Sequence, residues 1–143
     1  MIQEITKTAK EAGYAVTPLV DYSAVEVCIS EQTKKGTSAF YVMMPRDDVR
    51  QKGEYDYTTE QTIELLGAVP CPFSNSDIED FKNVERIASR LKGNLLEIID
   101  ALETSGRYGA IEQVRFTIIP FRVSAFCTCV TATFTLKKNI EVC

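Results

Sequence analysis

The stretch SDIEDFKNVERIASRLKGNLLEIIDALETSG, residues 76–106, carries the longest periodic pattern in this chain. It opens with a capping box, Ser76-Asp77-Ile78-Glu79, and closes at Ser105-Gly106. Its apolar residues recur every three or four positions, as on one stripe of an α-helix: Ile78, Phe81, Val84, Ala88, Leu91, Leu95, Ile98 and Leu102. Some 27 residues predict a rod of roughly 40 Å, long enough to cross a whole sheet. We expect Gly93, in mid-helix, to mark a close approach of the backbone to that sheet.

Two strands are predicted after this helix. In the first, apolar and polar residues alternate from Val114 to Ile118, before Pro120. The second spans Phe126–Lys137, and alternation gives it two different faces. Its apolar face holds Phe126, Val130, Ala132, Phe134 and Leu136. Its other face holds Cys127, Cys129, Thr131, Thr133, Thr135 and Lys137. We expect the apolar face to pack on the long helix and the other to meet solvent or a neighbouring molecule.

Hydroxyl groups are concentrated on this last strand, at Thr128, Thr131, Thr133 and Thr135. One interpretation of the hydroxyl-rich face is an ordinary exposed sheet surface. The other is a subunit interface that tolerates close approach of a neighbour. Under the second interpretation, Thr131, Thr133 and Thr135 are candidate interaction residues.

The N-terminal part predicts a short helix and several strands. The helix has a thin apolar stripe, which predicts a surface location: Ile2, Ile5, Ala9 and Ala12. Gly13 follows at the position of a left-handed helix cap. Residues 16–20 predict a strand that Pro18 confines to a sheet edge. Residues 25–29 and 38–44 predict an antiparallel hairpin, and the second of these, SAFYVMM, is apolar on both faces.

The most polar stretch is PRDDVRQKGEYDY, residues 45–57, which predicts a long loop. It is either a solvated hairpin tip or an arm that becomes ordered on a partner, with Tyr55 and Tyr57 as anchors. Alternating apolar residues then predict a strand over residues 58–69. A short helix ending at Gly67 is the alternative.

Together these elements predict an α+β fold. A mainly antiparallel sheet of about five to six strands packs on one long helix, with a short N-terminal helix beside it. The length of 143 residues and the 45% hydrophobic content predict a single domain, residues 1–143. The chain has no apolar run of the length that a membrane helix needs, and its N-terminus lacks a signal-peptide core.

Composition argues against ordinary catalysis and against DNA recognition. The chain contains no histidine, the usual general base near neutral pH and the commonest metal ligand. Its net charge is −4 without a basic stripe, whereas nucleic-acid binders concentrate positive charge. Its five cysteines form no CxxC pair and predict reduced thiols in a cytosol. We therefore predict a protein-binding function, no enzyme activity, and no catalytic, cofactor-binding or metal-binding residues.

The second half of the chain resembles tail-terminator and head–tail connector proteins of tailed bacteriophages. The resemblance lies in IELLGAVPCPFSNSDIEDF (residues 63–81), the helix VERIASRLKGNLLEIIDALE (residues 84–103) and the threonine-rich hairpin of residues 116–142 with its closing Cys143. Where the family's final strand has a glycine–valine pair, this chain has Cys129-Val130.

The resemblance implies a virion structural protein of the neck or tail, assembled in the host cytoplasm. Its copies would form a homo-oligomeric ring that joins the head and portal to the tail. Its implied partners are further copies and other neck, tail or portal proteins. Genomic DNA would pass through the ring without specific binding, and no cofactor and no membrane are implied. Two alternatives remain open: a bacterial adaptor or immunity-type domain that binds one partner as a monomer, and an enzyme without histidine.

Overall fold

The computed structural model describes residues 2–19, 38–51, 57–70, 78–122 and 126–137. These residues form two helices and six strands. In chain order they are α1 (Ile2–Glu11), β1 (Val16–Leu19), β2 (Ala39–Met43), β3 (Arg46–Gln51), β4 (Tyr57–Pro70), α3 (Ile78–Thr104), β5 (Val114–Arg122) and β6 (Phe126–Lys137). The predicted α+β class, with one long helix and a short N-terminal one, is confirmed.

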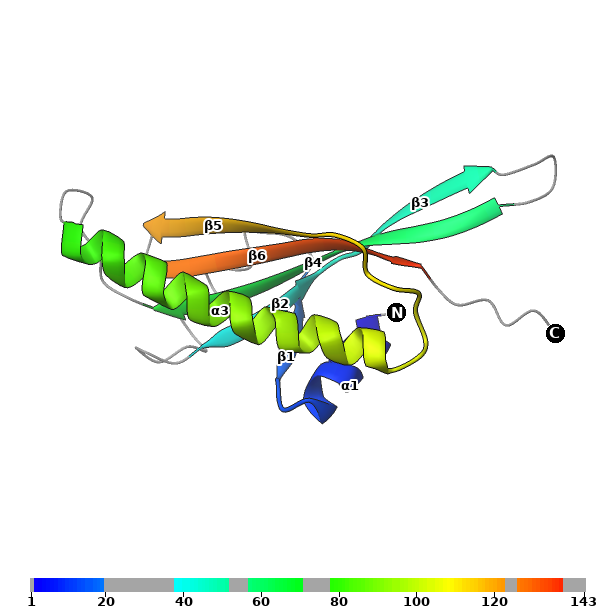
Figure 1. The fold of residues 1–143 in the computed structure, drawn as a ribbon, viewed down its shortest axis with the longest axis horizontal. Coiled ribbons are helices and arrows are strands. Elements are labelled where there is room, and N and C mark those ends of the chain that lie inside the picture. Colours follow the sequence, from blue (N-terminus) through cyan, green and yellow to red (C-terminus); the bar gives the residue numbers. More distant parts are fainter. Residues whose placement is uncertain (1, 20–37, 52–56, 71–77, 123–125, 138–143) are drawn as a thin grey trace.

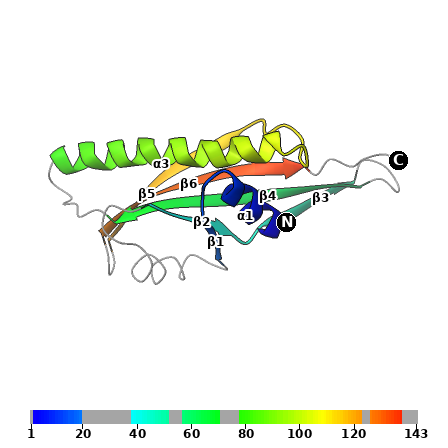
Figure 2. The same ribbon diagram turned by 90° about the horizontal axis from the view of Figure 1, so that it is seen from below.

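All six strands belong to one sheet with the order β1-β2-β4-β6-β5, and β3 pairs with β4 outside this path. The β1–β2 pair is parallel and the remaining pairs are antiparallel, as the sequence predicted for most of the sheet. The two helices lie on the same side of the sheet, with α3 running obliquely across it (Figures 1 and 2). The sheet therefore has one face covered by helices and one that is turned away from them.

The apolar stripe of α3 and the apolar face of β6 form the main core. Leu91, Leu95, Ile98 and Leu102 of α3 are fully buried. They cluster with β6 side chains from alternate positions: Val130, Ala132, Phe134 and Leu136. This packing confirms the prediction for both elements. The two elements can pack in this way because every second residue of a strand, and every third or fourth residue of a helix, lies on one side of its element.

The strand predicted over residues 58–69 is confirmed, and the helical alternative is wrong. β4 is the central strand, and it pairs along Glu60–Pro70 with β6. β5 continues through Pro120 to Arg122, beyond the end that the sequence predicted. Because β5 lies at the sheet edge, a proline is tolerated in it.

The loop predicted over residues 45–57 is wrong for Arg46–Gln51, which form β3. Val42 of β2 pairs with Leu65 of β4, and Arg46 of β3 pairs with Thr62 of β4. Three residues of the β2–β3 side therefore face two residues of β4, which defines a β-bulge that includes Pro45. Beyond the bulge, β3 and the start of β4 form a two-stranded ribbon that projects past the helix-covered body (Figure 1). Charged residues are common on such edge strands, which explains why a polar composition did not prevent strand formation.

α1 is fixed against α3 and against the segment before β5 by apolar packing and two tyrosines. Ile5 and Ala9 are fully buried. The Tyr108 hydroxyl donates a hydrogen bond to Glu4 Oε2 at 2.7 Å. The Tyr14 hydroxyl donates to Glu97 of α3, and its ring meets Phe40 edge-on at a centroid distance of 5.3 Å. The predicted cap at Gly13 is confirmed by its positive φ of 97°.

The hairpin predicted from residues 25–29 and 38–44 is described only in its second strand, β2. Residues 25–29 lie outside the described residues, and β2 pairs with β1 and β4. The close helix–sheet approach expected at Gly93 is wrong, because nothing lies within 4 Å of a Cβ built there. The approach occurs at Gly67 of β4, where a Cβ would lie 3.2 Å from Leu91 Cδ2.

Candidate interaction surface

The sheet face turned away from the helices carries polar rows across β4, β5 and β6. Phe134 and Leu136 point into the helix-covered core, so their odd-numbered neighbours on β6 point to the opposite side. In the β4–β6 register, Glu60 lies beside Lys137, Thr62 beside Thr135 and Glu64 beside Thr133. Arg115 of β5 lies on the other side of Thr133 and extends that row. We call this set the polar face.

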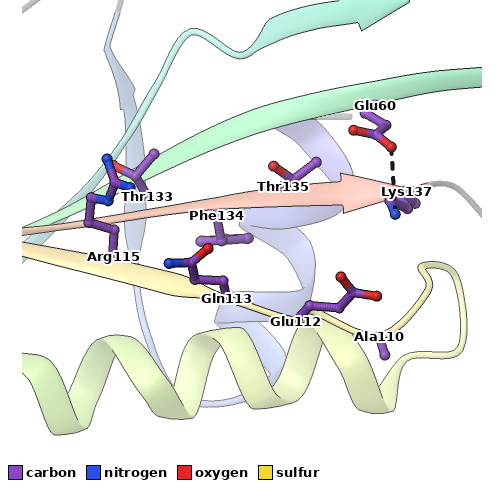
Figure 3. Close-up of a pocket in the computed structure, with 9 residues that line it drawn as sticks. All are labelled: Glu60, Ala110, Glu112, Gln113, Arg115, Thr133, Phe134, Thr135 and Lys137. Atoms are coloured by element: carbon purple, nitrogen blue, oxygen red, sulfur yellow. Dashed lines mark ion pairs between the residues drawn. The ribbon is translucent and has the colours of Figure 1, made fainter. Parts of the chain in front are cut away.

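A groove of about 290 Å³ lies on the polar face (Figure 3). In the close-up, α1 lies behind the strands. Three strands and the segment leading into β5 supply its lining: Glu60, Ala110, Glu112, Gln113, Arg115, Thr133, Phe134, Thr135 and Lys137.

Charge in this groove is balanced. Lys137 Nζ lies 3.5 Å from Glu60 Oε1. Glu112 and Arg115 add one further charge of each sign. Beside the groove, burial raises the pKa of the Glu64 carboxyl above its ordinary value. Balanced charges with threonine hydroxyls and an amide suit hydrogen bonding to a polar protein surface and give no strong preference for an anion or a cation.

The candidate threonines do not share one environment. Thr133 and Thr135 are half-buried in the groove. Thr131 is only 3% exposed, so the expectation that it offers its side chain to a partner does not hold for the chain as described. Its place in the sheet explains this, since it pairs with the fully buried Leu66 on β4.

The expectation that Thr128 belongs to the hydroxyl-rich face is wrong. Its even number places it on the side of Val130, in the helix-covered half of the sheet. The side chain is fully buried, and its Oγ1 has no hydrogen-bond partner among the described residues. An unpaired buried hydroxyl lowers stability.

The two candidate tyrosines lie near the projecting ribbon. Tyr57 is the first residue of β4, and its backbone pairs with Gln51 at the outer end of β3. The side chain of Tyr57 and the whole of Tyr55 lie outside what the structure describes. The projecting shape of the ribbon agrees with the arm that the sequence suggested, but the anchoring role of the two tyrosines stays a prediction.

A second buried cluster on the same side of the sheet as the polar face was not predicted. It contains Leu19, Tyr41, Met43, Leu66, Ala68 and Cys129. Part of the signal was present in SAFYVMM, which is apolar on both faces and therefore typical of a strand buried on both sides. The polar face is thus limited to one end of the sheet.

No cluster for metal chemistry is formed by the described residues: no three His, Cys, Asp or Glu side chains lie together there. Cys129 is a buried free thiol. Cys28, Cys71, Cys143 and the side chain of Cys127 lie outside the described parts. Within those parts, neither helix has the length and hydropathy to cross a membrane.

Neither a model of a protein family nor any curated protein shows significant similarity to the sequence.

Proposed function

We propose that this protein is a virion structural subunit of a phage neck or tail, whose copies form a homo-oligomeric ring between the head or portal and the tail. The placement in a phage neck or tail comes from the sequence resemblance. The ring is supported by the sheet, because each copy in a ring must offer two different surfaces on opposite sides.

The observation that carries the proposal is the pair of unequal sheet edges. β5 forms one edge, and among the described strands only β6 pairs with it. The opposite edge consists of β1 and β3, of which β3 pairs only with β4 in the described residues. An unpaired strand edge offers N–H and C=O groups to a further strand. Two such edges of different sequence favour head-to-tail contacts, which close into a ring when the rotation between copies permits.

Two further features agree with this function. The β3–β4 ribbon projects from the body (Figure 1) and would extend the contact of each copy with its neighbour or with another neck protein. A two-stranded ribbon has little stability alone, so a partner would stabilise it. The net charge of −4 would let DNA pass through the ring without adhering to it.

The test combines size measurement with imaging. Size-exclusion chromatography with light scattering, over about a hundredfold range of protein concentration, is expected to show one discrete oligomer at the upper end. Negative-stain electron microscopy of that fraction is expected to show rings with a central opening. A monomer at every concentration that also binds none of the portal or neck proteins of its phage contradicts the proposal. A monomer that binds one protein at a one-to-one ratio supports the adaptor function instead.

A further inference from the structure

The outer ridge of α3, opposite its buried stripe, carries positive and negative charges in separate places. The helix forms an outer layer on its side of the sheet (Figure 2). A row of exposed residues, three or four positions apart, runs along this ridge: Arg86, Arg90, Gly93, Glu97 and Asp100. This row, which we call the charged row, begins with two cations, passes through a glycine and ends with two anions.

The charges of this row are not offset within the described parts of the chain. No ion pair joins Arg86, Arg90 or Asp100 to another side chain there. Glu97 accepts a hydrogen bond from Tyr14, whose hydroxyl is neutral. Like charges three or four residues apart repel one another on a helix, and the last turn of α3 has no basic residue that would offset the acids. Opposite charges from outside the chain would therefore stabilise both ends of the row.

Gly93, at the centre of the row, is not required by the fold of the chain itself. A Cβ built there has nothing within 4 Å. Among the described glycines, the positive φ values belong to Gly13 and Gly106, so Gly93 keeps a backbone conformation that is open to any residue. Glycine inside a helix lowers stability relative to alanine, but it lets another backbone approach closely. An approach that uses Gly93 has to come from outside the chain, because its surroundings are open.

The charged row is self-complementary about Gly93. Arg86 lies seven residues before Gly93, and Asp100 lies seven residues after it. Two copies of α3 that run antiparallel and cross at Gly93 therefore bring Arg86 of each copy level with Asp100 of the other, roughly 10 Å from the crossing point. Arg90 and Glu97, three residues before and four residues after Gly93, come within one residue of the same match.

We infer that this ridge of α3 docks on the same ridge of a second copy, in a two-fold antiparallel contact centred on Gly93. The occupant is a second copy because the row supplies both members of each ion pair. A polyanion such as DNA fits less well, since Glu97 and Asp100 would repel its phosphates. A two-fold contact is closed by two copies. It uses neither edge of the sheet, so it goes beyond the proposed ring and doubles whatever unit those edges build.

The first test is the salt dependence of this contact, because its ion pairs lie at the protein surface and are screened by salt. A concentration series in light scattering gives the dissociation constant of the step that doubles the mass. This dissociation constant is expected to rise by about tenfold between about 0.05 M and about 0.5 M salt. A doubling step that is absent, or that is independent of salt, contradicts the inference.

Two full-length variants, Arg86→Glu and Asp100→Arg, each reverse one charge of the row. A pair of identical variant chains then holds two repulsive contacts in place of two attractive ones, so each variant alone should weaken the doubling step by about tenfold or more. Lys7→Glu and Glu11→Arg are the matched controls, because both residues are exposed on α1 and undergo the same changes of charge. Both controls should leave the step unchanged. Circular dichroism first establishes that all four variants fold like the unaltered chain.

Mixing the two interface variants gives the deciding result. In a mixed pair the two altered residues face each other with opposite charges, and the unaltered Asp100 of one chain faces the unaltered Arg86 of the other. The mixture should therefore regain the affinity of the unaltered chain. If each variant is weakened and the mixture stays weak, α3 does not meet a second α3 and the inference is wrong. If neither variant is weakened, the inference is wrong as well, whereas the ring, which uses the sheet edges, is unaffected. A chain that shows the doubling step but never a ring overturns the proposed function and supports this contact.

Discussion

The Tyr108 hydroxyl donates a hydrogen bond to Glu4 Oε2 at 2.7 Å, across 104 positions of the chain. It joins the segment before β5 to the first turn of α1. Tyr108 is only 3% exposed, and its hydrogen bond to the half-buried Glu4 is partly shielded from water. A short terminal helix of ten residues has little stability in isolation, and this contact helps to keep it on the body of the protein.

Removal of this hydroxyl is expected to destabilise the fold. Tyr108→Phe should lower the free energy of unfolding by about 1.5 kcal/mol, because a hydrogen bond to a charged group is lost while the ring packing remains. Tyr14→Phe is the control, since its hydroxyl bonds Glu97 at the solvent-exposed surface. Urea denaturation at neutral pH measures both, and the control should change by less than Tyr108→Phe. Equal effects would contradict the importance of burial at Tyr108.

The same two tyrosines predict a loss of stability in alkaline solution. Burial, with the Glu4 hydrogen bond, raises the pKa of Tyr108 above its ordinary value of 10.0. The hydrogen bond to Glu97, with burial, raises the pKa of Tyr14 to about 12. The folded chain therefore holds both phenol protons more tightly than the unfolded chain does. The resulting contribution to the free energy of unfolding is complete below pH 10 and is lost as the pH rises through the folded pKa values. The difference in free energy of unfolding between the unaltered chain and the variant with both Tyr14→Phe and Tyr108→Phe should therefore shrink from pH 9 to pH 12, as measured by urea denaturation.

Gly67 and Gly93 should respond oppositely to alanine. At Gly67 a Cβ would meet Leu91 Cδ2 at 3.2 Å and Phe40 Cε1 at 3.3 Å, both in the buried core. Gly67→Ala is therefore expected to destabilise by about 1 kcal/mol through overpacking. Gly93 has open space and lies in mid-helix, so Gly93→Ala should stabilise by up to about 1 kcal/mol. Thermal unfolding of both variants measures the two effects. A stabilising Gly67→Ala would show that the Leu91 and Phe40 side chains move to accommodate the methyl group, contrary to the expectation.

Thr128 offers a test of its buried hydroxyl. Thr128→Val keeps the shape of the side chain and removes the unpaired Oγ1, so it is expected to leave stability unchanged or to increase it by about 1 kcal/mol. Thr128→Ser is the control, because it keeps the hydroxyl and removes the methyl group, and it should destabilise by about 1 kcal/mol. Chemical denaturation ranks the three chains. A large loss in Thr128→Val would mean that the hydroxyl makes a hydrogen bond in solution.

Neighbouring leucines test the orientation of α3. Leu95 is fully buried, whereas Leu96 is 46% exposed. Leu95→Ala should cost about 3 kcal/mol, in the usual range for a cavity in a core. Leu96→Ala should stay within about 0.5 kcal/mol, measured at a concentration low enough to keep the chain monomeric. Similar losses for both would contradict an orientation of α3 that buries Leu95 and exposes Leu96.

The predictions from sequence succeeded where the pattern is local and repeated. The capping box and apolar spacing predicted α3, and strict alternation predicted which side of β6 meets it. Predictions failed where the neighbour across the sheet decides the outcome. β3 is polar enough to be taken for a loop, but hydrogen bonds to β4 make it a strand. Thr131 has the composition of a surface residue, yet it pairs with Leu66 at a buried site.

The helical period of α3 and the alternation of β6 could be read from consecutive residues, and the absence of histidine from composition. The close helix–sheet contact at Gly67 instead of Gly93, and the placement of Met44 and Ile118 on opposite edges of the sheet, required the folded structure. Such facts depend on strand order and register, which arise from hydrogen bonds and packing between segments far apart in the chain.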